Sequence, residues 1–248
     1  MKICLIGQNL TNLILASVFE EKKLNVDIFL NKKFQNIKTN RTIAISSGNF
    51  DYLEFLANSR INSWKTKEIK IFIEDSASKE IINFDKTKRE VFNLTYYSKL
   101  YELFLKKIIK SKYVKLIHSD TSKPSLIKKI KNYDLVFNSE SKNFISNKFF
   151  TNKIKKDYKG QAHTFLINHK KKNNNTAIQI FTKFGPLAFL PLSDKRTSIV
   201  FSCKGNKISE EIILDLFEKY NSFYSITKKT KIEKISLGFE MLRNYTHN

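Results

Sequence analysis

The first thirty residues constrain the fold of this chain more than any other stretch. Residues 2–6 form a short, nearly continuous apolar run, as expected for a strand that is buried on both faces. Apolar residues then recur at helical spacing from Leu10 to Val18, and a second β-type run covers residues 26–30. A strand, a tight turn, a helix and a strand predict a βαβ unit, which needs a parallel sheet around it.

The turn of this unit contains Gly7 and carries only part of a dinucleotide-binding pattern. That pattern is G-x-G-x-x-G, whose glycines let a pyrophosphate approach the backbone at the helix N-terminus. In this chain the three glycine positions hold Gly7, Asn9 and Asn12. The spacing is compatible with a phosphate site at the turn and equally with a purely structural βαβ unit, and it does not separate the two.

Composition narrows the range of partners. The chain has 45 lysines and arginines against 23 acidic residues, a formal net charge of +22. Only 5 of the basic residues are arginines, and the lysines are spread along the whole chain. A specific nucleic-acid surface would cluster its charge and use arginine for bidentate contacts, so we expect no specific nucleic-acid partner.

The compartment follows from hydropathy and from the cysteines. No apolar run reaches membrane-spanning length, so we expect no transmembrane segment. Cys4 and Cys203 each lie in an apolar, strand-like run. Two such residues indicate buried free thiols in a reducing cytosol rather than a disulfide framework.

Downstream of the βαβ unit, the pattern extends an α/β domain. Residues 49–58 and 94–112 have helical periodicity, and residues 114–117 and 133–138 are strand-like. Residues 69–84 alternate as a β-hairpin around a polar turn at 75–78. Trp64, the only tryptophan, is expected to fill a core position.

The last hundred residues have a different pattern of elements. Four closely spaced strands predict an antiparallel meander in which residues 169–175 form a basic hairpin loop. A helix at 208–220 and a strand at 232–237 follow. This change predicts a second domain with its own antiparallel sheet. The four strands are residues 162–168, 176–183, 187–192 and 197–203.

Segments along the chain resemble one known family. Residues 177–192, AIQIFTKFGPLAFLPL, closely resemble the A-x-x-x-F-x-x-x-G-P-L-A-x-L-P-L stretch of flavin-dependent aromatic hydroxylases, in particular those of ubiquinone biosynthesis. Residues 157–162, DYKGQA, are similar to the D-Y-x-x-x-A segment of that family, and residues 41–46, RTIAIS, to its R-x-x-A-L-S segment. Together with the βαβ unit, these segments span essentially the whole chain in the family's order.

The resemblance implies an architecture and an activity. It implies an α/β fold with a Rossmann-like FAD-binding domain, residues 1–148, whose mainly parallel sheet carries an inserted hairpin at 69–84. An antiparallel-sheet substrate domain would cover residues 149–248. The implied function is FAD-dependent monooxygenation of an aromatic ring in ubiquinone biosynthesis. The substrate would be a polyprenylated phenol or quinone precursor, the partners other proteins of that biosynthesis, and the location the cytoplasm, free or at a membrane surface.

The same resemblance assigns candidate site residues. The turn, the residue after the second strand and an arginine would contact FAD, and the strand that begins near Phe184 would line the substrate ring. It assigns no catalytic residue, and the four histidines lack metal-ligand spacing. The cofactor residues are Gly7, Gln8, Asn9, Leu10, Asn12, Asn31 and Arg41; the substrate residues are Phe184, Gly185, Pro186, Leu187 and Phe189.

The chain departs from the family pattern at the cofactor site. Asn9 and Asn12 replace glycines, and Asn31 stands where an acidic residue would bind the ribose. Glu140 and the serine after it replace an internal D-G motif, and a G-D motif that contacts the ribityl chain would begin beyond Asn248. We therefore expect weak FAD binding or none. A truncated or degenerate monooxygenase, a non-catalytic partner or scaffold, and a basic nucleic-acid binder stay open.

Overall fold

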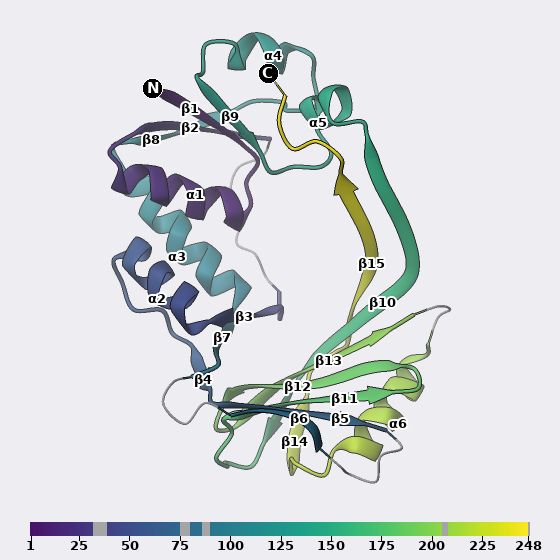
Figure 1. The fold of residues 1–248 in the computed structure, drawn as a ribbon. Helices are drawn as coiled ribbons and strands as arrows, with labels where there is room; N and C mark the ends of the chain where they lie inside the picture. The colour runs from purple at the N-terminus through teal and green to yellow at the C-terminus, as the bar shows by residue number, and fades with distance from the viewer. Residues whose placement is uncertain (32–38, 75–79, 86–89, 205–207, 248) are drawn as a thin grey trace.

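A computed structural model describes residues 1–31, 39–74, 80–85, 90–204 and 208–247 (Figure 1). It has an α/β fold built on three sheets. None of the helices in these ranges is long and apolar enough to cross a membrane. Cys4 and Cys203 are both free and buried, as the sequence predicted.

A four-stranded parallel sheet forms the N-terminal part, with strand order β8-β2-β1-β9. In its register Ile3 lies opposite Val26 on β2 and opposite Leu135 on β9. This sheet confirms the predicted βαβ unit, in which α1 (Leu10–Glu21) connects β1 to β2. The strands are β1 (Lys2–Ile6), β2 (Asn25–Leu30), β8 (Val114–His118) and β9 (Leu135–Asn138).

Helices cover both faces of the parallel sheet (Figure 1). Ile3 and Leu5 are buried in one cluster with α1, α2 (Ser47–Ala57) and α3 (Tyr97–Lys110). Cys4 and Ile6 point to the other face, where Leu126 and Ile145 complete a smaller cluster. This alternation explains why the first strand reads as an unbroken apolar run. The helices on the second face are α4 (Ser125–Ile130) and α5 (Phe144–Phe149).

A small antiparallel sheet of order β3-β7-β4 lies below the helices in Figure 1. Its strands are β3 (Thr42–Ser46), β4 (Trp64–Thr66) and β7 (Phe92–Tyr96). The predicted helix from residue 94 was therefore wrong at its start, because α3 begins at Tyr97. Asn93, Leu94 and Thr95 are buried, and pairing with two neighbouring strands outweighs the helical periodicity there.

Eight strands form the third sheet, with the order β14-β10-β13-β12-β11-β5-β6 and β15 also paired with β10. The sheet is mixed, because β5 runs parallel to β11 while the other pairs are antiparallel. The strands are β5 (Glu68–Ile73), β6 (Glu80–Asp85), β10 (Lys153–His169), β11 (Thr176–Thr182), β12 (Gly185–Ser193), β13 (Arg196–Cys203), β14 (Ile226–Lys229) and β15 (Glu233–Leu242).

The predicted simple meander was wrong in one pairing. β10 lies beside β13 and not beside β11, so residues 169–175 are not a hairpin loop. Instead this segment crosses the end of the sheet, anchored by Asn174. Its side-chain amide donates to the Ser193 carbonyl at 2.7 Å and to Thr197 Oγ1 at 3.0 Å. Lysines 170–172 and Asn173 are exposed, as expected of this basic tract.

The predicted hairpin at 69–84 is present as β5 and β6. It is hydrogen-bonded to β11 and so extends the large sheet rather than the parallel one. The expected turn at 75–78 lies outside the described residues. The boundary between residues 148 and 149 stays a prediction.

One face of the large sheet is covered by α6 (Glu210–Tyr220). Phe165, Phe189 and Phe201 are fully buried against Phe217 of that helix. Burying four such rings removes a large apolar area from water, which stabilises this half of the molecule.

Candidate nucleotide-binding turn

The turn after β1 has the backbone shape expected of a phosphate-binding loop. Gly7 has φ +117°, and its N–H donates to the Phe29 carbonyl at 3.0 Å. A Cβ at Gly7 would lie 2.7 Å from Glu140 Cγ. The glycine is therefore required both by its backbone conformation and by the Glu140 side chain that packs over it.

The two asparagines at glycine positions hold the turn in place. Asn9 caps α1, because its Oδ1 accepts from the Asn12 N–H at 3.1 Å, while its Nδ2 donates to Ser139 Oγ at 2.7 Å. Asn12 is 1% exposed, and its Nδ2 donates to the carbonyls of Ile6 and Gly7 at 2.9 and 2.8 Å. The Asn12 side chain thus points into the turn. It does not stand in the path of a ligand, which corrects that part of the sequence argument.

The first turn of α1 offers hydrogen-bond donors to an anion. Within the described ranges, the N–H groups of Leu10 and Thr11 donate to no other group of the chain. Free amides at a helix N-terminus carry partial positive charge and attract phosphates. The Leu10 side chain is buried in the core, so only its backbone could contact a ligand.

A pair of tyrosines connects this turn to Arg41. Tyr101 Oη donates to the Gln8 carbonyl at 3.1 Å, and the rings of Tyr97 and Tyr101 lie 6.4 Å apart. The guanidinium of Arg41 lies over the Tyr97 ring at 4.8 Å, and the Tyr97 N–H donates to the Arg41 carbonyl at 3.0 Å. The structure therefore brings Gln8 and Arg41, two predicted cofactor residues, to opposite ends of one short row of side chains.

The tyrosines themselves were missed from the sequence. Their helical spacing on α3 is the same signal that core residues produce, so it did not mark them as site residues. Burial raises the pKa of Tyr101 to about 12, which keeps its hydroxyl protonated and able to donate to Gln8.

Asn31 lies at the end of β2, where a ribose-binding carboxylate was expected. Its Oδ1 accepts from the Thr121 N–H at 3.1 Å. The side chain therefore holds the segment that follows β8, and the amide carries no charge for a ribose hydroxyl. The described residues also contain no group of three histidine, cysteine or acidic side chains that could hold a metal.

The predicted substrate residues lie on β12 and in the turn before it. Gly185 has φ +134°, and a Cβ there would lie 2.0 Å from the Ser202 carbonyl oxygen, so strand packing alone requires this glycine. Phe184 lies in the exposed turn before it, and Pro186 is half-buried on the strand. The side chains of Leu187 and Phe189 are fully buried under α6, which argues against their contacting a substrate.

The residues around Gly7 fit the pyrophosphate of FAD at the backbone and oppose it in charge. The positive φ, the two free amides and Arg41 suit a phosphate. The Glu140 carboxyl group beside Gly7 adds negative charge where a pyrophosphate would lie. The backbone of this turn therefore suits a phosphate, and the Glu140 side chain beside it does not.

Comparison with known proteins supports the fold assignment. No family model and no curated protein sequence matches the chain. Among solved structures, p-nitrophenol 4-monooxygenase PnpA from Pseudomonas putida DLL-E4 aligns with a TM-score of 0.72 and 8% identity, over 99% of this chain and 70% of PnpA. The tetrameric form of 2-methyl-3-hydroxypyridine-5-carboxylic acid oxygenase aligns with a TM-score of 0.69 and 10% identity, over 99% and 72%.

The name of a third similar structure includes a cofactor, FAD. PqsL, a probable FAD-dependent monooxygenase from Pseudomonas aeruginosa, aligns with a TM-score of 0.63 and 11% identity, over 88% of this chain and 63% of PqsL. The chain therefore has the fold of FAD-dependent aromatic monooxygenases. At these identities the likeness establishes the fold and not the activity.

Proposed function

We propose that this chain holds the cofactor and substrate of an FAD-dependent monooxygenase that acts on an aromatic ring. The observation that carries the proposal is the row from the Gly7 turn through Tyr101 and Tyr97 to Arg41, at the carboxyl ends of parallel strands. That edge is where open α/β sheets bind their ligands. The chain spans 63–72% of the monooxygenase structures named above, so the activity of a whole protein is part of the proposal.

The roles of this chain's own groups follow from their chemistry. FAD, when bound, would supply the oxygen-transfer chemistry. The amides of Leu10 and Thr11 would donate to the pyrophosphate, and Arg41 would add a fixed positive charge beside it. Tyr101 would keep the Gln8 carbonyl engaged, so that the turn presents N–H groups to the ligand.

The affinity for FAD is expected to be low. The Glu140 charge beside Gly7 and the missing carboxylate after β2 each cost about 1–3 kcal/mol, or about one to four orders of magnitude together. Weak FAD binding is therefore still expected, but its cause is the Glu140 side chain and not the Asn12 side chain.

The finer part of the proposal is a polyprenylated phenol of ubiquinone biosynthesis as substrate, which rests on the GPLAFLPL resemblance. One feature of the structure supports a long apolar substrate. Ile235, Leu237 and Met241 lie along β15 with 38–43% of their surfaces exposed. Ile154 of β10 lies opposite Met241. If this row binds a prenyl chain, Leu237→Glu weakens binding of a prenylated phenol and leaves an unprenylated phenol unaffected in equilibrium dialysis. Equal effects on both ligands would contradict it.

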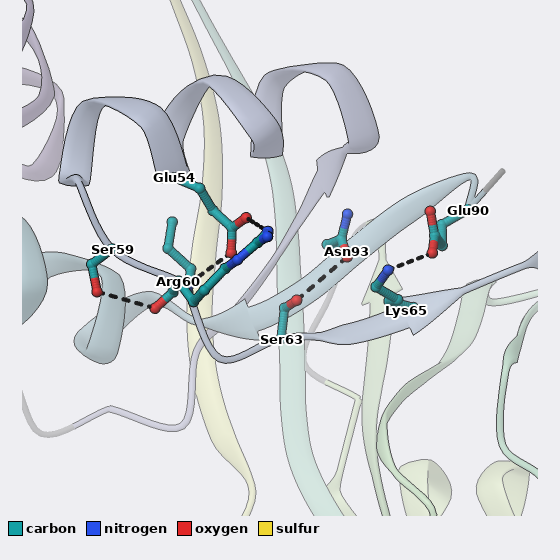
Figure 2. A network of polar contacts seen from close by, with 8 residues as sticks. Glu54, Ser59, Arg60, Ser63, Lys65, Glu90 and Asn93 are labelled. Atoms are coloured by element: carbon teal, nitrogen blue, oxygen red, sulfur yellow. Dashed lines mark hydrogen bonds and ion pairs between the residues drawn. The ribbon is translucent and has the colours of Figure 1, made fainter.

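Titration of FAD against the chain, followed by flavin fluorescence, tests the cofactor site. We expect saturable binding with a dissociation constant above about 10 µM. Arg41→Met should weaken it about tenfold and Glu140→Gln should strengthen it severalfold. Arg60→Met is the matched control, because Arg60 pairs with Glu54 on α2 at 2.8 Å (Figure 2). No saturable binding near about 1 mM, or equal affinities in all variants, would leave the non-catalytic partner as the better proposal.

A further inference from the structure

A cavity lies where the small sheet meets the end of the large sheet. Its volume is about 580 Å³, within the range of small-molecule sites. Its lining includes Trp64 of β4, Tyr96 of β7 and Lys99 of α3, together with Lys195 and Arg196 at the β12–β13 turn. Two consecutive tyrosines therefore lie at different sites. Tyr97 lies against Arg41 near the nucleotide turn, and Tyr96 lines this cavity.

The cavity has an uncompensated positive charge. The lining contains three basic side chains, Lys99, Lys195 and Arg196. The described residues of the lining include no carboxylate. None of the three forms an ion pair with a carboxylate in the described ranges. Two carboxylates in neighbouring segments have partners of their own. Glu90 pairs with Lys65 at 2.6 Å (Figure 2), and Asp194 pairs with Lys171 at 3.7 Å.

Arg196 is held in place by neutral groups. Its Nε donates to Asn168 Oδ1 at 3.0 Å, and one terminal nitrogen donates to Tyr96 Oη at 3.3 Å. A guanidinium has five N–H donors, so these two bonds leave donors for a ligand. A guanidinium oriented in this way suits a carboxylate, which can accept two parallel hydrogen bonds.

His169 of the cavity lining belongs to a buried polar network. Tyr224 Oη donates to Asn174 Oδ1 at 2.8 Å, and Asn174 Nδ2 donates to Thr197 Oγ1 at 3.0 Å. His169 Nε2 lies 3.0 Å from the same Thr197 oxygen. Asn174, Thr197 and His169 are each at most 3% exposed. This network fixes the backbone on both sides of Arg196, so little ordering would be needed when a ligand binds.

We propose that this cavity binds a small anion with a carboxylate group on a planar ring. Arg196 recognises the carboxylate, Lys99 and Lys195 add attraction, and the rings of Trp64 and Tyr96 contact the planar body. The lining includes neither Arg41 nor a residue of the Gly7 turn, so this proposed site is distinct from the proposed FAD site.

The sole tryptophan makes the proposal directly testable. Trp64 lines the cavity, so its emission reports on ligand binding there. Benzoate serves as the probe, benzyl alcohol as the same ring without charge, and acetate as the charge without the ring. Ligand-observed NMR of benzoate provides a second readout that does not depend on fluorescence. Both titrations use the full chain without FAD.

We expect benzoate to change Trp64 emission saturably and to bind at least tenfold more tightly than benzyl alcohol or acetate. Arg196→Met should weaken benzoate binding about tenfold or more, since one charge-assisted contact is lost. Arg60→Met again serves as the control and should leave the titration unchanged. Circular dichroism melting of both variants establishes that they fold. No saturable benzoate binding by either readout, equal affinity for benzyl alcohol or acetate, or an unchanged titration in folded Arg196→Met would overturn the proposal.

Discussion

At the scale of single residues, two glycines of this chain do opposite things. Gly7 has a left-handed backbone and no room for a Cβ beside Glu140. Gly48, inside α2, has no atom within 4 Å of the position that a Cβ would take. A glycine loses more conformational entropy on folding than other residues do. Steric constraints require glycine at position 7, whereas position 48 can accept a side chain.

Gly7→Ala should therefore lower the free energy of unfolding by about 1–3 kcal/mol, since it combines strained backbone with a clash. Gly48→Ala should raise it by about 0.5–1 kcal/mol, because alanine is the better helix former. Urea denaturation of both variants provides the measurement. Combining Gly7→Ala with Glu140→Ala should recover part of the loss by removing the clash. Equal effects of the two glycine substitutions would contradict this account of the turn.

At the scale of elements, Glu74 joins β5, α6 and the β11–β12 turn. It follows β5, and its Oε1 accepts from Lys219 Nζ of α6 at 3.0 Å and from the Tyr220 hydroxyl. Its Oε2 accepts from the Lys183 N–H in the β11–β12 turn at 2.5 Å. These bonds lower the pKa of Glu74 to about 2, and the bond from Tyr220 has the largest effect. The carboxylate thus fastens the hairpin and α6 to the same end of the sheet.

Because the folded pKa lies below the unfolded value of 4.5, ionised Glu74 stabilises the fold above about pH 4.5. That contribution is lost as the pH falls from about 4.5 to about 2. In Glu74→Gln the free energy of unfolding should start lower at pH 7 and fall less between pH 5 and pH 3 than in the unmodified chain. Glu218→Gln, at an exposed ion pair with Lys229, is the control and should keep the unmodified pH slope. Parallel pH profiles for all three proteins would refute the assignment.

At the scale of the whole molecule, the large sheet is connected to the rest of the chain in more than one place. β10 extends over 17 residues from near α5 into the large sheet with β15 alongside (Figure 1), and its register shifts between Asp157 and Gly160. Such a bulge bends a strand, here in the ribbon that spans the two parts. On the other side, Trp64 Nε1 donates to the Asn174 carbonyl and ties the small sheet to the large one. Trp64 is half-buried at this junction and is not the core residue that was predicted.

The sequence alone determined the elements whose signal is local. A continuous apolar run makes residues 2–6 a strand, helical spacing makes α1 and α6, and the turn at Gly7 follows from its glycine. These patterns depend on neighbours within a few residues, so they can be read without a partner. They were enough to predict the α/β fold class, whereas the cofactor residues came from the family resemblance and stay a prediction.

Only the tertiary structure decided which strands pair and which side chains meet. β5 and β11 are more than 100 residues apart, and Arg196 reaches Tyr96 across 100 residues of sequence. A strand has two hydrogen-bonding edges and accepts many partners of similar pattern, so its neighbour depends on how the whole core packs. The meander, the start of α3 and the place of Trp64 were mispredicted for that reason. The cavity lined by Trp64 and Arg196 could not be predicted from the sequence, because its lining residues come from separate segments.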